Sequence, residues 1–419
     1  MNSLLTATCI PETMCVAKLF KAAYDGIDLR PLREETFARA QSDPSDAAAR
    51  IDLGVIDQLL GDQASGLKWQ QGALRLQRLY RSCWPASRQA LRVLAFLAPG
   101  DVGANTPVDF LLQDLDVVLY SLYIVPGEPL PDTLPDHDVA IATADDSESN
   151  RAVLRDIGRV LPMWPRPVLN RPECIVRLSR EKMYSFLQSV PGLLMPPTVR
   201  VTRASLEKMA LDAPVLGNTS PDLRFPLNTF PVIIRPIDSH AGRGLAKVDV
   251  PSSISAYLAE RKEAEFVTSP FIDYRSSDGL FRKYRIIWVD GRPHPCHMGI
   301  SADWKVWYYN AGMATNAAKR AEEAEFMNGF HQGFARRHAH ALAAIVNKFR
   351  LEYLGIDCAE MPDGRLLVFE GSISLVAHDM DPPDVYPYKS AHMQKLFADF
   401  YGMLKRKSVA GEVCVGENI

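Results

Sequence analysis

Residues 355–372, GIDCAEMPDGRLLVFEGS, constrain the fold more than any other stretch of the chain. The Pro-Asp-Gly series within 361–365 is hairpin-turn chemistry, and the apolar runs on both sides have the length of strands. Each predicted strand carries one carboxylate, Asp357 on the first and Glu370 at the end of the second. A hairpin brings such positions together, so the two acids would repel each other unless a cation lies between them. They are either ligands of Mg²⁺ bound together with nucleotide phosphates or two acids that face solvent.

The composition of the 419-residue chain is that of a globular protein, with 47% hydrophobic and 23% charged residues. The formal net charge of -3 provides no basic field for nucleic acid or for an anionic membrane. No apolar run has the length of a membrane span, and the first residues make a poor signal peptide, so we expect a cytoplasmic protein. The seven cysteines are dispersed without a CxxC pair, which indicates reduced thiols rather than disulfides or a zinc site.

The first part of the chain is predicted to be helical up to about residue 81. Apolar residues recur at helical spacing over 38–60 and 66–80, and Gly61 with Asp62 forms the break between them. The pair resembles an αα-hairpin and a single tetratricopeptide unit. A repeat array needs at least three such units, so we interpret the segment as a helical appendage that could hold a peptide or protein partner.

Strands and helices are expected to alternate from residue 91 onwards. Apolar runs at 92–97, 117–125 and 138–143 precede a helical pattern at 149–161, which is typical of βαβ units with a parallel sheet. The proline-rich segment 162–172 is a natural domain border.

A glycine-rich hairpin is expected at 230–248, FPVIIRPIDSHAGRGLAKV. Its first strand ends at Arg235, which can add a charge-assisted contact to a phosphate. The small residues Ala241, Gly242 and Gly244 allow backbone N–H groups to approach an anion closely. The pattern is not a Walker loop, and a tight hairpin without a ligand would look the same.

Strands are also predicted at 265–272 and 282–289. In the second of these, Lys283 and Arg285 alternate onto one face. The two cations are either solvated edge residues or phosphate-binding residues. The aromatic run at 304–309 (WKVWYY) is expected in the core, and the alternative is a wall of a ligand site.

One long helix is expected over 322–349. Its histidines His331, His338 and His340 lack the i,i+4 spacing of a helical zinc pair, so we expect them to face solvent. A last helix is predicted at 391–404.

The order of the basic, glycine-rich and acidic segments along the chain resembles that of the ATP-grasp superfamily. Within this superfamily it is similar to the RimK-like carboxylate–amine ligases. The likeness covers roughly residues 91–404. The phrases LRVLAFLAPGDVGANTP and WPRPVLNRP are also similar to bacterial ATP-grasp proteins with a tetratricopeptide-like N-terminal extension.

The resemblance implies an α/β fold (α+β ATP-grasp) in which the nucleotide lies between two antiparallel sheets. The implied parts are a helical extension (1–88), a small parallel α/β pre-ATP-grasp domain (89–172), a central lobe with the glycine-rich loop (173–268), a C-terminal lobe with the metal site (269–407) and a flexible tail (408–419).

The resemblance also implies roles for individual residues. Arg285 is the implied catalytic residue, which holds the transferred phosphoryl group or the acyl phosphate. The implied ATP-binding residues are Lys182, Arg235, Ser239, His240, Gly242, Gly244, Ser269 and Phe271. The implied metal ligands are Asp357, Glu370 and Ser372, and the candidate substrate residues are His378, Asp379 and Asp381.

Four positions depart from the family pattern. Arg235 replaces the usual Lys, Pro270 replaces the acid of the hinge, Lys283 replaces an Asp, and Ser372 replaces an Asn. The last departure either weakens one metal site or moves a ligand to Asp379 or Asp381.

The implied function is an ATP-dependent, ADP-forming ligase that joins a carboxylate to an amine through an acyl phosphate. Its cofactors would be ATP and Mg²⁺ or Mn²⁺, and its acceptor a small amino acid, a peptide or a precursor peptide. A homodimer is compatible with the sequence. The alternatives are a catalytically silent ATP-grasp scaffold and a phosphotransferase on the same fold.

Overall fold

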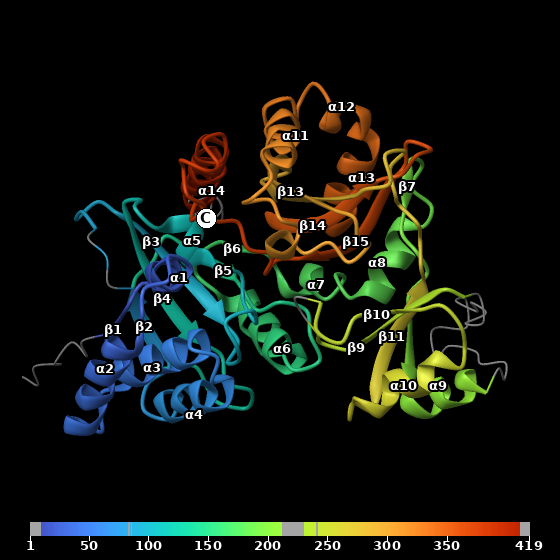
Figure 1. Ribbon diagram of the computed structural model, residues 1–419. Helices are drawn as coiled ribbons and strands as arrows, with labels where there is room; N and C mark the ends of the chain where they lie inside the picture. Colours follow the sequence, from blue (N-terminus) through green and yellow to red (C-terminus); the bar gives the residue numbers. More distant parts are fainter. Residues whose placement is uncertain (1–9, 83, 85, 212–229, 240–241, 411–419) are drawn as a thin grey trace, which may run out of the picture.

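The computed structural model describes residues 10–410 except 83, 85, 212–229 and 240–241 (Figure 1). Within this part of the chain the strands form three sheets. The predicted residue His240 and the end of the predicted tail lie outside the described residues. No helix of the described part combines the length and the hydropathy that crossing a membrane requires.

The first sheet has the strand order β1-β2-β4-β3-β5-β6. Its central strands β3, β4 and β5 pair in parallel, as the alternating pattern predicted. The side chains of β3 and β5 are almost entirely buried, whereas β4 buries three of its seven. The strands are β1 (Glu12–Thr13), β2 (Leu79–Ser82), β3 (Leu91–Leu97), β4 (Val117–Tyr123), β5 (Val139–Ala142) and β6 (Val168–Leu169). The helical elements between them are α5 (Val108–Leu112), α6 (Arg151–Val160) and η1 (Leu161–Met163).

Four helices lie between β1 and β2 in the chain, namely α1 (Val16–Tyr24), α2 (Arg30–Ser42), α3 (Ala47–Leu59) and α4 (Gln63–Leu74). The predicted break at Gly61 and Asp62 is confirmed, since Asp62 caps α4 by accepting from the Ser65 backbone N–H. The predicted helix over 38–60 is wrong because Pro44 and the N-cap Asp46 interrupt it.

The predicted helix over 66–80 is also wrong in its last part. It ends at Leu74, and residues 79–82 form strand β2 beside β4. The helical segment therefore shares a sheet with the α/β segment through β1 and β2. The domain boundaries expected from the sequence, 1–88 and 89–172 among them, stay predictions.

The second sheet is antiparallel, with the order β10-β9-β11-β8. It includes the predicted glycine-rich hairpin, whose strands β9 and β10 pair in register. Helices α9 and α10 cover one face and enclose a separate core that contains Val201, Ile234 and Phe266 (Figure 1). The elements are β8 (Val199–Thr202), α9 (Arg203–Ala210), β9 (Val232–Pro236), β10 (Ala246–Val248), α10 (Ser253–Ala259) and β11 (Glu265–Pro270).

The third sheet has the order β13-β12-β14-β15-β7 and is antiparallel except at β15 and β7. It contains the predicted hairpin of Asp357 and Glu370, which face each other as register partners. Its strands are β7 (Leu193–Leu194), β12 (Phe281–Val289), β13 (Arg292–Ser301), β14 (Tyr353–Glu360) and β15 (Leu366–Ser372). The surrounding helices are α7 (Pro172–Ile175), α8 (Arg180–Leu187), η2 (Tyr308–Asn310), α11 (Ala317–Asn328), α12 (Phe334–Arg337), α13 (Ala339–Phe349) and α14 (Lys389–Ala410).

The single long helix expected over 322–349 is wrong. Gly329 and Gly333 bound a turn between α11 and α12, and α13 begins after His338. The expectation that His338 faces solvent is also wrong, because its ring is buried and Nε2 lies 2.8 Å from Glu360 Oε1. Helix α14 packs against α5 and against β12 and β13, and so connects the first sheet to the third.

Candidate active site

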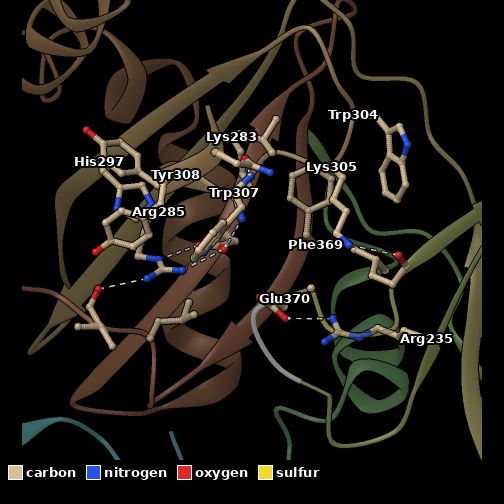
Figure 2. A pocket seen from close by; sticks show the side chains of 18 of the residues that line it. Arg235, Lys283, Arg285, His297, Trp304, Lys305, Trp307, Tyr308, Phe369 and Glu370 are labelled. Carbon is tan, nitrogen blue, oxygen red and sulfur yellow. Dashed lines mark hydrogen bonds and ion pairs between the residues drawn. The ribbon is translucent and has the colours of Figure 1, made fainter. Parts of the chain in front are cut away.

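A cavity of about 680 Å³ is lined by residues of both antiparallel sheets. One wall comes from β9 and β11, and the opposite wall from β12, β13, β14 and β15. Gly103, in the loop that follows β3, and Phe20 on α1 also line it. All three sheets or the helices next to them therefore contribute to one site. Figure 2 shows side chains of the second and third sheets in it.

Asp357 is the most buried acid of the cavity, with 1% of its surface exposed. The antiparallel pairing of β12 with β14 places Arg285 directly opposite Asp357. Arg285 Nε donates to Oδ1 at 2.8 Å, and Lys283 Nζ donates to Oδ2 at 2.9 Å. Burial by itself raises the pKa of Asp357, but these two cations outweigh burial and hold the pKa far below its ordinary value. Asp357 is thus a permanent anion in a nearly dry position.

Glu370 meets two other cations. Arg180 of α8 donates to Oε2, and Arg235 Nη1 lies 3.7 Å from the same oxygen. Figure 2 shows Glu370 and Arg235 pointing toward each other from the two sheets. Burial raises the pKa of Glu370, and the charges of Arg180 and Arg235 lower it below its usual value. The cross-strand acid pair is thus neutralised by cations of three different elements.

Basic side chains outnumber acidic ones among the described residues that line the cavity. The bases are Arg180, Arg235, Lys283, Arg285, Lys305 and Lys389, and the acids are Asp357, Glu370 and Asp381. The excess of positive charge favours an anionic ligand.

Arg235 lies next to the last residue of β9 and contacts the glycine-rich loop that follows this strand. Its Nε donates to Ser239 Oγ at 2.9 Å, and its Nη2 donates to the Ser239 carbonyl oxygen. Burial, followed by the charge of Arg180, lowers the pKa of Arg235 to about 10, so the guanidinium stays charged at neutral pH. Gly242 and Gly244 have φ values of 69° and 64°, which favour glycine. Gly242 lines the cavity, whereas Ser239 and Gly244 support the loop behind it.

The predicted hinge residues Ser269 and Phe271 line the cavity at the end of β11. The Phe271 ring lies 4.7 Å from Lys247 Nζ and 5.7 Å from the Trp304 ring centroid. Two aromatic rings that meet edge to face at 82° therefore line this end of the cavity and offer apolar contacts to a ring system.

Besides Ser239 and Gly244, three predicted site residues of the described part are not brought to the cavity lining. Lys182 Nζ donates to the Val176 carbonyl oxygen at 2.8 Å, and Arg180, two residues earlier, lines the cavity instead. Ser372 Oγ donates to Asp145 Oδ2 at 2.7 Å. Asp379 accepts hydrogen bonds from Ser390 and Gln394 of α14.

His378 and Asp381, also predicted, do line the cavity. Asp381 Oδ1 accepts from Tyr24 at 2.8 Å, and Oδ2 accepts from Lys389 at 2.7 Å. Neither Tyr24 nor Lys389 was predicted, because Tyr24 lies 357 positions from Asp381 and no local motif marks Lys389, which lies eight positions from it.

The aromatic run at 304–309 was expected in the core, and this is wrong for three of its members. Trp304, Trp307 and Tyr309 line the cavity, and the last two are 48% and 50% exposed. Tyr308 is buried and hydrogen-bonds Glu323 at 2.9 Å, although it also contributes to the lining. The alternative interpretation, a wall of a ligand site, therefore describes the run better.

The acid pair has the donor chemistry for a magnesium ion. In the described part of the chain, no group of three or more His, Cys, Asp or Glu residues could hold a metal. Mg²⁺, however, is usually bound through one or two carboxylates together with phosphates and water. Arg180 and Arg235 both approach Glu370 at the same oxygen, Oε2. Oδ1 of Asp357 accepts one hydrogen bond from Arg285 Nε, and because an oxygen has two lone pairs it can also bind a metal ion. Asp357 and Glu370 therefore fit Mg²⁺, whereas the Ser372 hydroxyl is held by Asp145.

The described part of the chain thus has a parallel α/β sheet followed by two antiparallel sheets that face one cavity. The chain is similar to the crystal structure of a RimK domain protein ATP-grasp from Sphaerobacter thermophilus DSM 20745. The identity is 16%, 74% of this chain and 98% of the other are covered, and the TM-score is 0.40. It is also similar to the VanG D-Ala:D-Ser ligase from Enterococcus faecalis, with 12% identity, 75% and 100% coverage and a TM-score of 0.44.

Comparisons with family models and with curated proteins give no match.

Proposed function

We propose that the chain is an ATP-dependent ligase that joins a carboxylate to an amine and releases ADP and phosphate. The observation that carries this proposal is the cross-strand pair of buried Asp357 and half-buried Glu370, flanked by Arg180, Arg235 and Arg285, in a cavity between two antiparallel sheets. Such a set of charges serves the transfer of a phosphoryl group, which depends on positioning and on neutralisation of charge.

The nucleotide would lie between the hinge and the glycine-rich loop. The edge-to-face rings of Phe271 and Trp304 offer apolar contacts to adenine, and Arg235 with the backbone at Gly242 suits the phosphates. Lys305 reaches toward the same loop, with Nζ 3.4 Å from the Leu245 carbonyl oxygen. In this arrangement Lys182 and Gly244 support the site without contacting the nucleotide.

Asp357 and Glu370 would hold Mg²⁺, which neutralises the charge of the phosphates when bound. Arg285, fixed by Asp357 and by the Val376 carbonyl oxygen, points its guanidinium into the cavity and would hold the transferred group. His378 and Asp381 mark the part of the cavity in which the second substrate would bind.

The reaction has two balanced steps. The carboxylate of one substrate takes the terminal phosphoryl group of ATP, which gives an acyl phosphate and ADP. The amine of the other substrate then attacks the acyl carbon, phosphate leaves, and the nitrogen gives up a proton. Neither step needs a nucleophilic side chain, because proximity and charge stabilisation supply the catalysis.

An assay with substrate pools tests this proposal. Purified protein is mixed with Mg-ATP, a pool of carboxylates and a pool of amines, and the release of ADP and of phosphate is followed. Release that requires both pools is the expected result. A phosphoryl group that stays on the acceptor would identify a phosphotransferase instead. No ADP release from any combination, together with no thermal shift by Mg-ATP, would identify a scaffold.

A further inference from the structure

The N-terminal helix α1 reaches the part of the cavity assigned above to the second substrate. Phe20 lines the cavity, and Tyr24, one turn further along the same face of the helix, donates a hydrogen bond to Asp381 at 2.8 Å. A segment that precedes the ATP-grasp fold in sequence is thus fastened to the loop that bears His378 and Asp381.

Aromatic rings continue from α1 across this end of the cavity. The Phe20 and Phe110 rings are 5.4 Å apart, the Tyr24 and Tyr309 rings 6.1 Å, and the Tyr309 and Trp307 rings 5.2 Å. Four of these residues line the cavity, namely Phe20, Phe110, Trp307 and Tyr309. The half-exposed rings of Trp307 and Tyr309 leave apolar surface uncovered, and a ligand side chain would gain by burying it.

The polar groups among these rings have their charges compensated within the protein. Both oxygens of Asp381 are occupied, one by the Tyr24 hydroxyl and one by the Lys389 ammonium. Glu323 and the rings of Tyr308 and Tyr386 also surround the Lys389 ammonium. Burial lowers the pKa of His378 to about 4, so its ring is neutral at pH 7. This end of the cavity therefore favours an apolar group over a charged one.

We propose that Phe20, together with Phe110, Trp307 and Tyr309, forms a subsite for the apolar side chain of an amino acid or short peptide substrate. The proposal rests on the ligase function argued above. It gives the N-terminal helices a second role, since they would select the substrate from within the cavity.

Direct binding tests the subsite without relying on turnover. Isothermal titration calorimetry of the full chain uses L-phenylalanine and L-leucine as apolar probes, and glycine and L-glutamate as comparison probes. The two apolar amino acids are expected to bind at least tenfold more tightly than glycine or glutamate. Phe20→Ala is expected to weaken their binding about tenfold, which is the effect of removing one large apolar contact.

Two further variants separate binding from folding. Lys18→Ala changes an exposed residue of the same helix and is expected to bind all probes as the unchanged protein does. Phe20→Leu keeps an apolar side chain against Phe110, and should weaken the binding of L-phenylalanine more than that of L-leucine.

Equal affinities for glycine and L-phenylalanine, no binding of either apolar probe, or unchanged binding in folded Phe20→Ala would overturn the subsite. Phe20-dependent binding without ADP release in any pool would support the subsite and overturn the ligase. ADP release with an apolar substrate whose KM is unchanged in Phe20→Ala would support the ligase and overturn the subsite.

Discussion

Lys283 and Asp357 lie on neighbouring strands, and Nζ of Lys283 is 2.9 Å from Oδ2 of Asp357. Arg285 holds the other oxygen of the same carboxylate at 2.8 Å. In the proposed ligase, a side-chain ammonium would thus share this carboxylate with the magnesium ion. The alternation of Lys283 and Arg285 on β12, which the sequence predicted, is the structural reason that both cations reach one acid.

Lys283→Met is therefore expected to lower the Mg²⁺ concentration needed for half-maximal ATP turnover. Removal of the competing ammonium should strengthen Mg²⁺ binding about tenfold, which corresponds to ~1.4 kcal/mol. The measurement is a Mg²⁺ titration of ADP release at saturating ATP.

Lys305→Met is the matched control for Lys283→Met. It removes a cation of the same cavity that contacts the Leu245 carbonyl oxygen instead of Asp357. We expect it to raise the KM for ATP and to leave the Mg²⁺ midpoint unchanged. Equal Mg²⁺ midpoints in the two variants would refute the proposed competition at Asp357.

Glu370→Gln is expected to lower Mg-dependent ATP turnover by about 100-fold or more. The substitution keeps the shape of the side chain but removes the charge that faces Arg180 and Arg235. Asp363→Asn, in the turn of the same hairpin, serves as control because its partner Arg365 lies on the surface. Both proteins should give native circular dichroism spectra. An active Glu370→Gln enzyme would disprove the assignment of Glu370 as a metal ligand.

Local sequence was sufficient to predict the acid hairpin and the glycine-rich hairpin. In each case a turn with Gly, Asp or Pro separates two apolar runs, so the pairing follows from neighbouring residues. The parallel sheet was also predictable, because β3, β4 and β5 are mainly apolar runs of strand length and helical patterns lie among them in the chain.

Contacts between distant segments were not predictable in this way. The rotation of the short helix α8 about its axis brings Arg180 to Glu370 and Lys182 to the Val176 carbonyl oxygen. The pattern of apolar residues in this helix does not predict that rotation. The pairing of β2 with β4 overrode a helical pattern over 66–80. The hydrogen bond of Tyr24 to Asp381 joins residues 357 positions apart, and nothing near either residue indicates it.

The contact between α3 and α4 leads to a prediction about stability. A Cβ atom at Gly66 would lie 2.6 Å from the Gly54 backbone oxygen, so Gly66→Ala forces the two helices apart. We expect a loss of ~2 kcal/mol in the free energy of unfolding, even though Ala is the better helix former. Urea denaturation measures the change.

Gly72→Ala, in the same helix, is the control for Gly66→Ala. A Cβ atom at Gly72 would meet only the tip of the Arg50 side chain, at 3.3 Å. Helix propensity should then dominate and raise the stability by up to ~1 kcal/mol. A Gly66→Ala protein as stable as Gly72→Ala would contradict the close approach of the two helices.

Asp52 of α3 makes the stability of the protein depend on pH. It is 2% exposed, its Oδ1 accepts from the Met14 backbone N–H at 2.9 Å, and burial raises its pKa from 3.8 to about 7. Between these two values the folded state keeps a proton that the unfolded state has lost. The contribution of Asp52 to stability therefore falls as the pH rises from about 4 to about 7, and the penalty is complete above that range.

Asp52→Asn removes this titration and keeps an oxygen that can accept from Met14. The variant is expected to match the unchanged protein at pH 4 and to exceed its stability on the order of 4 kcal/mol at pH 8. Urea denaturation at several pH values measures the difference, and Asp249→Asn, at an exposed aspartate, is the control. A difference that does not change with pH would show that Asp52 is already ionised in the folded state at pH 4. In that case the Arg39 guanidinium, 3.8 Å from Asp52 Oδ2, would have to offset the cost of burial.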